Sequence, residues 1–398
     1  MNRFISSNCA SPLSWHAGGY SRGIVALMDP LRRSAPPAAA PAPVRPRPLR
    51  LGFVPLTDAA PLIVAQELGC FARRGLSVQL SREVGWATIR EKIIYRELDA
   101  AHAPAPMLWA THFGIGCPPS EVLTALVLNR HGNALTLSHR LRPADVADAA
   151  SFQALIRSRH GENRFTFGAV FPFSSHYLFL RRWLTAKGIH PDRDVRIVIV
   201  PPAQMFRNLA AGTLDGYCVG EPWNSLAVRE GAGWCPAWSA AQAPGHLEKI
   251  LMVTRRFAEK RAAEHEALVA AIAEACAWCD EPLHREPLAT LLSGPRYLNL
   301  PARVIAPALL GRFNSGHGRT EAIPDFHVFQ RGNANVPAVD HARALQRDLV
   351  AAGLLEPPPA HLPALLFRED LHRRAVGGHP PPLAPPASPL SAATVLTG

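Results

Sequence analysis

The chain has 398 residues, of which 48% are hydrophobic and 18% are charged, and its formal net charge is +11. This composition is typical of a globular protein of two or three compact units, whose core needs no disulfide or metal for stability. Much of the basic excess lies in Arg-rich ends. Because the sequence contains no recognition helix, RNA-binding aromatic signature or paired Cys/His finger, we expect no direct nucleic-acid binding.

Both ends of the chain are rich in Pro and Ala, so we expect residues 1–48 to be a disordered arm and residues 373–398 a disordered tail. The longest apolar run near the start, "GIVALM", is shorter than a signal peptide requires. Arg32-Arg33 precedes a Pro-rich segment that cannot form the apolar helix of an export signal. The sequence has no run of about 18 apolar residues that would span a membrane. We therefore expect a cytoplasmic protein with no membrane partner.

Seven scattered cysteines are typical of a reducing compartment rather than of a disulfide framework. Cys276 and Cys279 form a CxxC pattern inside an Ala-rich helical run, and no second Cys or His pair follows at metal-finger spacing. The pattern predicts a small buried pair on a helix, and we expect no metal and no cofactor.

The first half of the chain alternates strand and helix signals. Residues 50–56 predict a strand that breaks at Pro55, and residues 57–75 predict a helix that Thr57 or Asp58 caps. A strand over 76–83 and a helix over 88–99 follow, the latter with a capping-box pattern from Thr88 to Glu91. Two strand-like runs within 122–139 are separated by a turn around Gly132. This order predicts a parallel sheet with helices on its faces.

The pattern restarts in the middle of the chain. Strands are predicted over 164–172, 195–202 and 216–222, with helices over 176–188 and 203–215 between them, and after residue 256 the chain is mostly helical. We predict two α/β lobes: residues 49–137 and 250–372 form lobe 1, and residues 138–249 form lobe 2. The chain would cross between them twice, within 134–139 and 248–256. A cleft between two such lobes is a favoured ligand site.

Residues at the predicted helix starts are the candidates for that cleft. Thr57 and Trp86 each follow a strand of the first unit, and Ser175 and His176 repeat this arrangement in the second. Free backbone N–H groups at helix starts suit an anion. Each residue also has a plain structural role to offer: Trp86 as core packing, Ser174 or Ser175 as a helix cap, and His176 as a satisfied polar group. Glu221 is a general acid or, as we favour, the anchor of the loop before Trp223.

Catalytic signatures are missing from the sequence. There is no Walker A loop, no GxGxxG after a strand, no GxSxG and no HExxH. Ser175 next to His176 is no catalytic arrangement, because a triad is defined in space. We expect no catalytic residues and no enzymatic activity.

Several long motifs resemble the nitrate/bicarbonate-binding proteins of the NrtA/CmpA type. They are residues 50–107, "VFPFSSHYLFLRRWLTAKGIHPDRDV", "LDGYCVGEPWNSLAVREGAGW" and "HLEK", in one order over residues 50 to about 355. The resemblance implies the type II periplasmic-binding-protein fold, in which two α/β lobes close on a ligand.

The resemblance also implies the ligand residues. In the nitrate binders of this family the anion is held by a Trp, a His and a Lys that match Trp86, with Ala87 beside it, His176 and Lys249. Asn133 falls where the family places a polar pocket residue. Thr57, Ser175 and Glu221 are further ligand-binding candidates. The bicarbonate binders carry a Glu in place of this Lys and recruit a cation. A Lys supplies charge and N–H donors to nitrate or nitrite, which we therefore expect as the ligand.

Two functions fit these observations. With its expected cytoplasmic location, the chain resembles the NasS-type nitrate/nitrite sensors. These sensors hold an ANTAR-type antiterminator protein inactive until ligand arrives, and that protein is the expected partner. The alternative is a solute-binding protein of an ABC importer for nitrate, nitrite or a related anion. A pyrimidine-forming thiamin enzyme shares the fold, but the Cys-rich iron motif associated with it is missing here.

Overall fold

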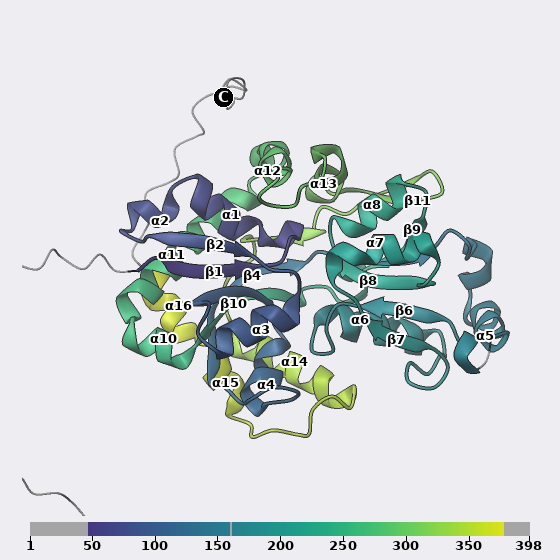
Figure 1. Cartoon of the computed structure of the whole chain (residues 1–398), viewed down its shortest axis with the longest axis horizontal. Coiled ribbons are helices and arrows are strands. Elements are labelled where there is room, and N and C mark those ends of the chain that lie inside the picture. Colours follow the sequence, from purple (N-terminus) through teal and green to yellow (C-terminus); the bar gives the residue numbers. More distant parts are fainter. Residues whose placement is uncertain (1–46, 160, 378–398) are drawn as a thin grey trace, which may run out of the picture. The chain divides into compact units, whose positions relative to one another are not determined.

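Two mixed β-sheets with helices on their faces make up residues 47–159 and 161–377, the part of the chain that the computed structural model describes (Figure 1). The first sheet has the order β13-β4-β10-β3-β1-β2. Its strands are β1 (Leu49–Phe53), β2 (Val78–Arg82), β3 (Ala100–Pro104), β4 (Val122–His131), β10 (Leu247–Thr254) and β13 (His327–Val328). The predicted α/β class is confirmed.

The second sheet has the order β7-β6-β8-β5-β9. Its strands are β5 (Asn133–Ser138), β6 (Thr166–Ala169), β7 (Arg196–Ile199), β8 (Gly216–Gly220) and β9 (Gly233–Trp238). A separate hairpin is formed by β11 (Arg312–Gly316) and β12 (Arg319–Ala322).

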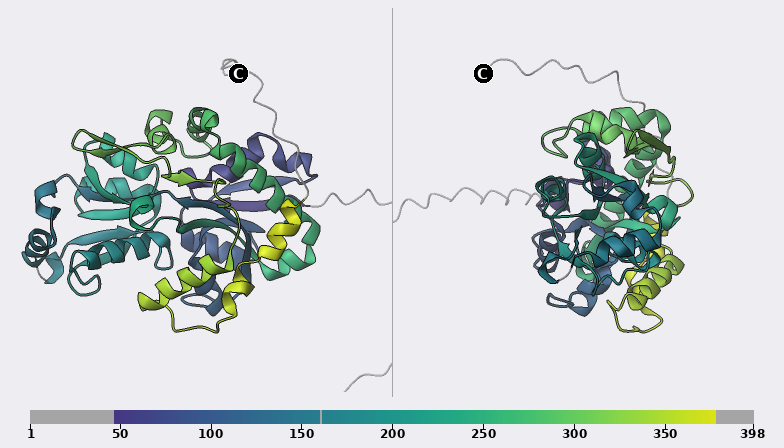
Figure 2. Two further views of the ribbon diagram at one scale, coloured as in Figure 1. Left: turned by 180° about the vertical axis from the view of Figure 1, so that it is seen from behind. Right: turned by 90° about the vertical axis from the view of Figure 1, so that its right-hand side faces the viewer.

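The helices divide between the sheets. With the first sheet lie η1 (Thr57–Ala59), α1 (Ala60–Glu67), α2 (Cys70–Arg73), α3 (Trp86–Ile94), α4 (Met107–Phe113), α10 (Arg255–Lys260), α11 (Ala262–Asp280), η4 (Pro282–His284), α12 (Arg285–Leu292), α14 (Val339–Ala351), α15 (Leu362–Leu366) and α16 (Glu369–Val376). With the second lie η2 (Pro143–Val146), α5 (Ala149–Arg157), η3 (Gly161–Asn163), α6 (Ser175–Ala186), α7 (Pro202–Ala211), α8 (Trp223–Arg229) and α9 (Ser239–Gln242). Helix α13 (Ala302–Leu309) contacts both α12 and α8. The view from behind in Figure 2 shows α14–α16 around the first sheet.

The expectation of a parallel sheet is only partly right. β1 is parallel to β2 and β3, but β10 is antiparallel to both β3 and β4. In the second sheet β5 is antiparallel to β8 and β9. The antiparallel strands β5 and β10 each follow a crossing of the chain from one sheet to the other. A crossing strand arrives from the opposite side, and its direction is therefore set by the crossing rather than by a strand–helix–strand unit.

The crossings lie earlier than we predicted. Because β5 pairs with the second sheet, the chain changes sheets at Gly132 and not after residue 137. The return strand β10 begins at Leu247, so the boundary at residue 249 is also too late. The sequence shows the turn at Gly132, where φ is +99°, but two apolar runs around a turn look like one hairpin. Nothing in their pattern indicates that they belong to different sheets.

The prediction that residues 250–372 all belong to lobe 1 is wrong for the β11–β12 hairpin. Phe313 of β11 packs with Ala134 and Cys235 of the second sheet, and β11 contacts β9 and α8. The chain then returns to the first sheet at β13. The apolar side chain of Phe313 fills a second-sheet cluster, so the hairpin is held there by burial.

Three predicted helix features differ in the structure. The helix over 57–75 is broken at Gly69, whose φ is +69°, and η1 and α1 have no side-chain cap hydrogen bond. Helix α3 already begins at Trp86 with Gly85 at its N-cap, so Thr88 is not a cap. Helix α16 continues to Val376, into the predicted tail of 373–398, because its Leu371 and His372 are buried. The rest of that tail, and the arm up to residue 46, lie outside the described residues.

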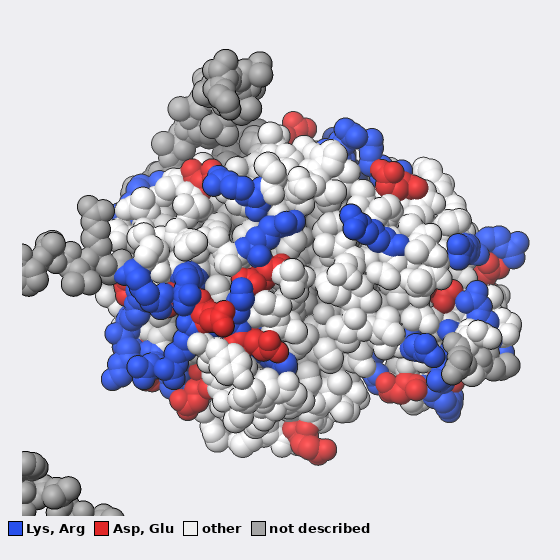
Figure 3. All heavy atoms as spheres, viewed as in Figure 1, with Lys and Arg blue, Asp and Glu red and all other residues white. Residues whose placement is uncertain are grey.

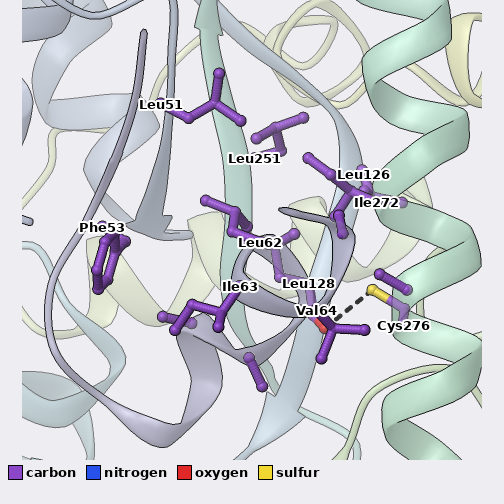
Figure 4. Packing of buried hydrophobic residues seen from close by; sticks show 14 of the residues in the cluster. Leu51, Phe53, Leu62, Ile63, Val64, Leu126, Leu128, Leu251, Ile272 and Cys276 are labelled. Atoms are coloured by element: carbon purple, nitrogen blue, oxygen red, sulfur yellow. Dashed lines mark hydrogen bonds between the residues drawn. The ribbon is translucent and has the colours of Figure 1, made fainter. Parts of the chain in front are cut away.

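The core of the first sheet lies between the sheet and helices α1 and α11 (Figure 4). Leu51 and Leu251 from the strands face Leu62 of α1 and Ile272 of α11 (Figure 4). The Sγ of Cys276 lies 3.7 Å from the backbone carbonyl of Leu128. Cys276 and Cys279 are both free and fully buried, so the expected buried pair on a helix is confirmed.

Many surface charges of the described residues are paired. Arg73 and Arg74 contact Glu274, and Arg261 contacts both Asp99 and Glu264. The face in Figure 3 accordingly shows acidic side chains among the basic ones. Within residues 47–159 and 161–377, no helix is both long and apolar enough to cross a bilayer.

Gly132 offers a test of the first crossing. A Cβ there would lie 2.6 Å from the His327 ring, whereas at Gly353, which also has a positive φ (+68°), it would meet nothing within 4 Å. Gly353→Ala should cost only the conformational strain, about 1 kcal/mol. Gly132→Ala should cost about 1–3 kcal/mol more through overpacking. Urea unfolding of both variants measures the difference, and equal losses would contradict the close contact.

Candidate functional site

Four of the side chains named from the sequence lie together between the two sheets: Trp86, Asn133, His176 and Lys249. Trp86 comes from the start of α3 and Lys249 from β10, while Asn133 begins β5 and His176 lies in the first turn of α6. Each is at most 1% exposed. Two strand ends, two helix starts and both crossings thus converge on one buried polar region.

Lys249 lies between two carboxylates. Its Nζ is 2.7 Å from Oδ2 of Asp58 and 2.6 Å from Oε1 of Glu248, and it lies 5.4 Å from the centroid of the Trp86 ring. Burial favours the neutral amine, but the two carboxylates outweigh it and raise the pKa of Lys249. Lys249 is therefore a fully buried ammonium group.

Glu248 contacts four other side chains of this buried region. Its Oε1 accepts from Lys249 and lies 3.5 Å from Nε2 of His176, and its Oε2 accepts from Nδ2 of Asn133 at 2.6 Å and faces Nε2 of His246 at 2.9 Å. Burial alone would raise its pKa, yet the neighbouring Lys249 and His176 hold the pKa of Glu248 well below the usual range. This carboxylate connects groups from both sheets.

A β-bulge explains how Glu248 and Lys249 meet. Successive side chains on a regular strand point to opposite faces, so residues 248 and 249 would point apart. The pairing of β10 with β4 shifts register between Leu247 and Lys249 and again between Lys249 and Ile250. Such irregularities re-aim side chains, and here they bring both charged groups to the same buried region.

Asp58, the second carboxylate beside Lys249, also contacts a histidine. Its Oδ1 lies 2.8 Å from Nε2 of His102 on β3. Burial opposes ionisation, but Lys249 and His102 lower the pKa of Asp58 well below its usual range. Burial lowers the pKa of His102 despite the adjacent carboxylate. The Trp86 ring packs against His102 with centroids 5.1 Å apart, so Trp86 supports this pair as well as the core.

Several buried donors have no hydrogen-bond partner among the described residues. They are Nε1 of Trp86, the hydroxyls of Thr57 and Ser175, and the N–H of the His176 ring, whose second nitrogen is an unpaired acceptor. Two acceptor oxygens of the region, Oδ1 of Asn133 and Oε1 of Glu221, are unpaired as well. Burial lowers the pKa of His176 to about 3, so its ring is neutral and carries one N–H. Because buried polar groups are normally paired, such a set of free donors is characteristic of a ligand site. Ser174, not Ser175, caps α6 by accepting from the Tyr177 N–H.

Two candidate residues are placed differently. Ala87 is exposed on α3, so its side chain is not part of the buried region. Glu221 is buried, and its Oε2 accepts from the backbone N–H of Ser225 at 3.3 Å, which fits the role of loop anchor. Burial, partly offset by hydrogen bonds from Ser225 and Asn224, raises the pKa of Glu221 to about 7. Its backbone carbonyl accepts from the Thr57 N–H at 2.8 Å, which ties η1 to the end of β8.

Sequence reasoning missed four members of the region: Asp58, His102, His246 and Glu248. Asp58 was interpreted as a helix cap, and Glu248 was overlooked beside Lys249. The available signal was the pair of adjacent charges at the start of the apolar strand "LEKILMVT", since ionised groups are seldom buried without partners. His102 within "AAHAPAP" offered the same kind of signal.

The chain is similar in sequence and in structure to known anion-binding proteins. The profile of the NMT1-like family matches residues 42–293. The nitrate/nitrite binding protein NrtA of Nostoc sp. is 32% identical over 302 residues, covering 73% of this chain and 68% of that protein. The crystal structure of periplasmic nitrate-binding NrtA from Synechocystis superposes with a TM-score of 0.78 at 28% identity and covers 83% of this chain and 88% of that one. The expected periplasmic-binding-protein-like fold is confirmed.

Longer relatives match as well. The nitrate import ATP-binding protein NrtC of Synechocystis is 37% identical over 313 residues, covering 78% of this chain and 47% of that protein. The bicarbonate transport ATP-binding protein CmpC of the same organism is 45% identical over 253 residues, covering 63% and 38%. The chain therefore spans less than half the length of these curated relatives.

Buried neutral histidines predict a dependence of stability on pH. Burial lowers the pKa to about 3 for His176 and His327 and to about 4 for His131 and His265. An unfolded histidine takes up a proton near pH 6.5, but these do not while folded. The folded state should therefore lose stability as the pH falls from about 6.5 towards 4, by up to about 1.4 kcal/mol per pH unit for each such group.

Urea unfolding at several pH values measures that slope. His176→Gln should make the slope shallower by about one proton. His361→Gln, which replaces an exposed histidine, should leave the slope unchanged. A slope in His176→Gln as steep as in the unaltered protein would show that His176 is not a buried neutral group.

Proposed function

The chain belongs to the NMT1-like family, and within it to the nitrate/bicarbonate-binding proteins of the NrtA/CmpA type; from this membership and the buried site we propose that it binds nitrate or nitrite between its two sheets. The observation that carries the proposal is the set of unpaired buried donors in this region: the indole N–H of Trp86, the ring of His176, and the hydroxyls of Thr57 and Ser175, which adjoin Asp58 and His176 in the sequence. Nitrate and nitrite are anions that only accept hydrogen bonds, and the indole N–H, the one ring N–H of His176 and the two hydroxyls can each donate to them.

The choice between nitrate and bicarbonate rests on Lys249. Bicarbonate carries an O–H that needs an acceptor as well as donors, whereas nitrate and nitrite do not. The ammonium group of Lys249 adds a positive charge next to the donors. Similarity to CmpC, a bicarbonate transport protein, makes bicarbonate the second candidate ligand.

Ligand binding would act on the contact between the sheets. The hydrogen bond from Thr57 N–H to the Glu221 carbonyl joins η1 to β8, and Glu248 joins Lys249 to Asn133 and His176. An anion that accepts from both Trp86 and His176 would stabilise this closed arrangement. Separation of the sheets would then be the route by which ligand enters and leaves.

We propose that the closed form serves a nitrate/nitrite sensor that releases an ANTAR-type antiterminator protein in the cytoplasm. The six described cysteines are free thiols, as is usual in a reducing compartment. Complete inversion of a two-state equilibrium needs about 5.5 kcal/mol of differential binding, which a small anion approaches only through several charge-assisted contacts. The alternative role is the solute-binding component of an ABC importer, which is the setting that the names of the relatives describe.

Titration calorimetry with nitrate, nitrite, bicarbonate and an alkanesulfonate tests the ligand. Nitrate or nitrite should bind, and Trp86→Phe should weaken that binding about tenfold or more, because a hydrogen bond to a charged group is worth about 1.5–3 kcal/mol. Trp278→Phe is the matched control: the Nε1 of Trp278 is also buried without a partner, but Trp278 stacks on His284 away from the site. Binding of bicarbonate alone would overturn the proposal in favour of the second candidate.

Cell fractionation and co-purification test the sensor role. The protein should be in the cytoplasmic fraction, and a co-purifying antiterminator should dissociate when nitrate or nitrite is added. Protein in the periplasm would favour the importer role instead. A partner that stays bound in saturating ligand would contradict the switch and leave the binding proposal intact.

A further inference from the structure

The formal charges of three buried groups in the site do not sum to zero. Asp58 and Glu248 are ionised and Lys249 is the one ammonium group between them, which leaves a formal charge of −1 before any ligand arrives. His176 and His102 add no charge, because burial lowers the pKa of both rings. Burial raises the pKa of Glu221 to about 7, so this carboxyl adds no charge below that pH and a further negative charge above it. A second negative charge in this buried space would be strongly unfavourable. A site for an anion therefore needs one more positive charge.

His246 is placed to supply that charge. Its Nε2 lies 2.9 Å from Oε2 of Glu248, and its Nδ1 lies 3.0 Å from the backbone carbonyl of Ala243. Both partners are acceptors, so the ring donates at both nitrogens only when it carries two protons. The doubly protonated imidazolium brings the sum over Asp58, Glu248, Lys249 and His246 to zero.

The groups around His246 do not replace it in that role. The ring of His131 packs against it with centroids 5.3 Å apart, but His131 donates from Nδ1 to the Asp325 carbonyl and accepts at Nε2 from the Gly245 N–H. That pattern requires a neutral ring, in agreement with its pKa of about 4, lowered mainly by burial. On the other side of His246, Arg182 and Asp348 face each other at 3.1 Å.

His246 also differs from the rest of the cluster in its access to solvent. Its side chain is 19% exposed, whereas those of Glu248, Lys249 and His176 are 0% exposed. It lines a cavity of about 460 Å³ between α6 and α14, together with Ser175, Arg182, His341 and Asp348. A proton can therefore reach His246 from this cavity while the two sheets stay in contact. The cavity also leaves room for a longer side chain at position 246.

On the basis of the proposed function, we propose that His246 is a positioning residue that sets the charge of the anion site: protonated, it neutralises Glu248, and the charge of Lys249 is then available to the anion. Because the charge of the site then depends on a histidine proton, nitrate affinity becomes dependent on pH. Anion binding favours the imidazolium, so the protein takes up a proton as it binds. Affinity is highest at low pH and falls as the pH rises.

Calorimetric titration with nitrate between pH 5.5 and 8.5 tests this directly. As the pH rises, the Kd should increase by up to about tenfold per pH unit, the limit for one linked proton. Titrations in buffers of different ionisation enthalpy should report uptake of up to one proton. A Kd that is constant over this range, with no proton uptake, would overturn the role of His246 while leaving nitrate binding intact. Failure to bind nitrate at any of these pH values would instead contradict the proposed function.

Variants at position 246 separate charge from structure. His246→Gln should bind weakly at every pH, with the dependence on pH removed. His246→Arg keeps a fixed positive charge, fits towards the cavity, and should bind tightly without dependence on pH. His361→Gln, an exposed histidine, is the matched control and should keep the profile of the unaltered protein. Thermal unfolding checks that each variant is folded; an unchanged pH profile in folded His246→Gln would assign the proton to another group.

Discussion

The ammonium group of Lys249, held between Asp58 and Glu248, is the interaction on which the rest of the site depends. A buried charge is tolerated only when opposite charges and hydrogen bonds replace the lost water. Here the partners come from η1 and from β10 itself, and Glu248 is in turn held by Asn133 from the second sheet. The position of one cation thus fixes the relation between η1, β10 and the start of β5.

This arrangement changes how selectivity is understood. A Lys in the pocket suggests simple attraction between a cation and an anion, but the charge of Lys249 is already matched by two carboxylates. In the proposed site, the shape and the hydrogen-bonding character of the free donors, Trp86 and His176 above all, therefore contribute to selectivity beside the charge of Lys249. A ligand that offers acceptors satisfies these donors, whereas a ligand that brings its own donor leaves one of them without a partner.

Periodicity predicted most of the elements because strands and helices leave local signals. The strands near residues 50, 80 and 216 and the cap at Ser174 could be found in this way. The sheet to which each strand belongs could not, because pairing is decided by distant partners. β5 shows this: an apolar strand next to a turn reads the same whichever sheet it joins. β11, with the sequence RFNSG, has only a weak strand signal and was not predicted as a strand.

The site was predictable to a similar extent. Trp86, His176 and Lys249 were identified through the resemblance, and the structure brings them together. Asp58 and Glu248 were missed because an acid near a helix start looks like a cap and because regular strand geometry separates neighbours. The bulge in β10 overrides that geometry, and an irregularity of one residue leaves no periodic signal.

The crossings at Gly132 and Leu247 have a mechanical consequence. Asn133 directly follows the first crossing at Gly132, and Lys249 lies just after the start of the return strand β10 at Leu247. If the sheets separate as proposed, these connections would lie near the axis of that motion, and Asn133 and Lys249 would lie close to it. Groups near an axis move little while distant ones sweep through long arcs. A small rotation caused by ligand contacts near the axis would therefore displace the outer helices much further than it displaces the site.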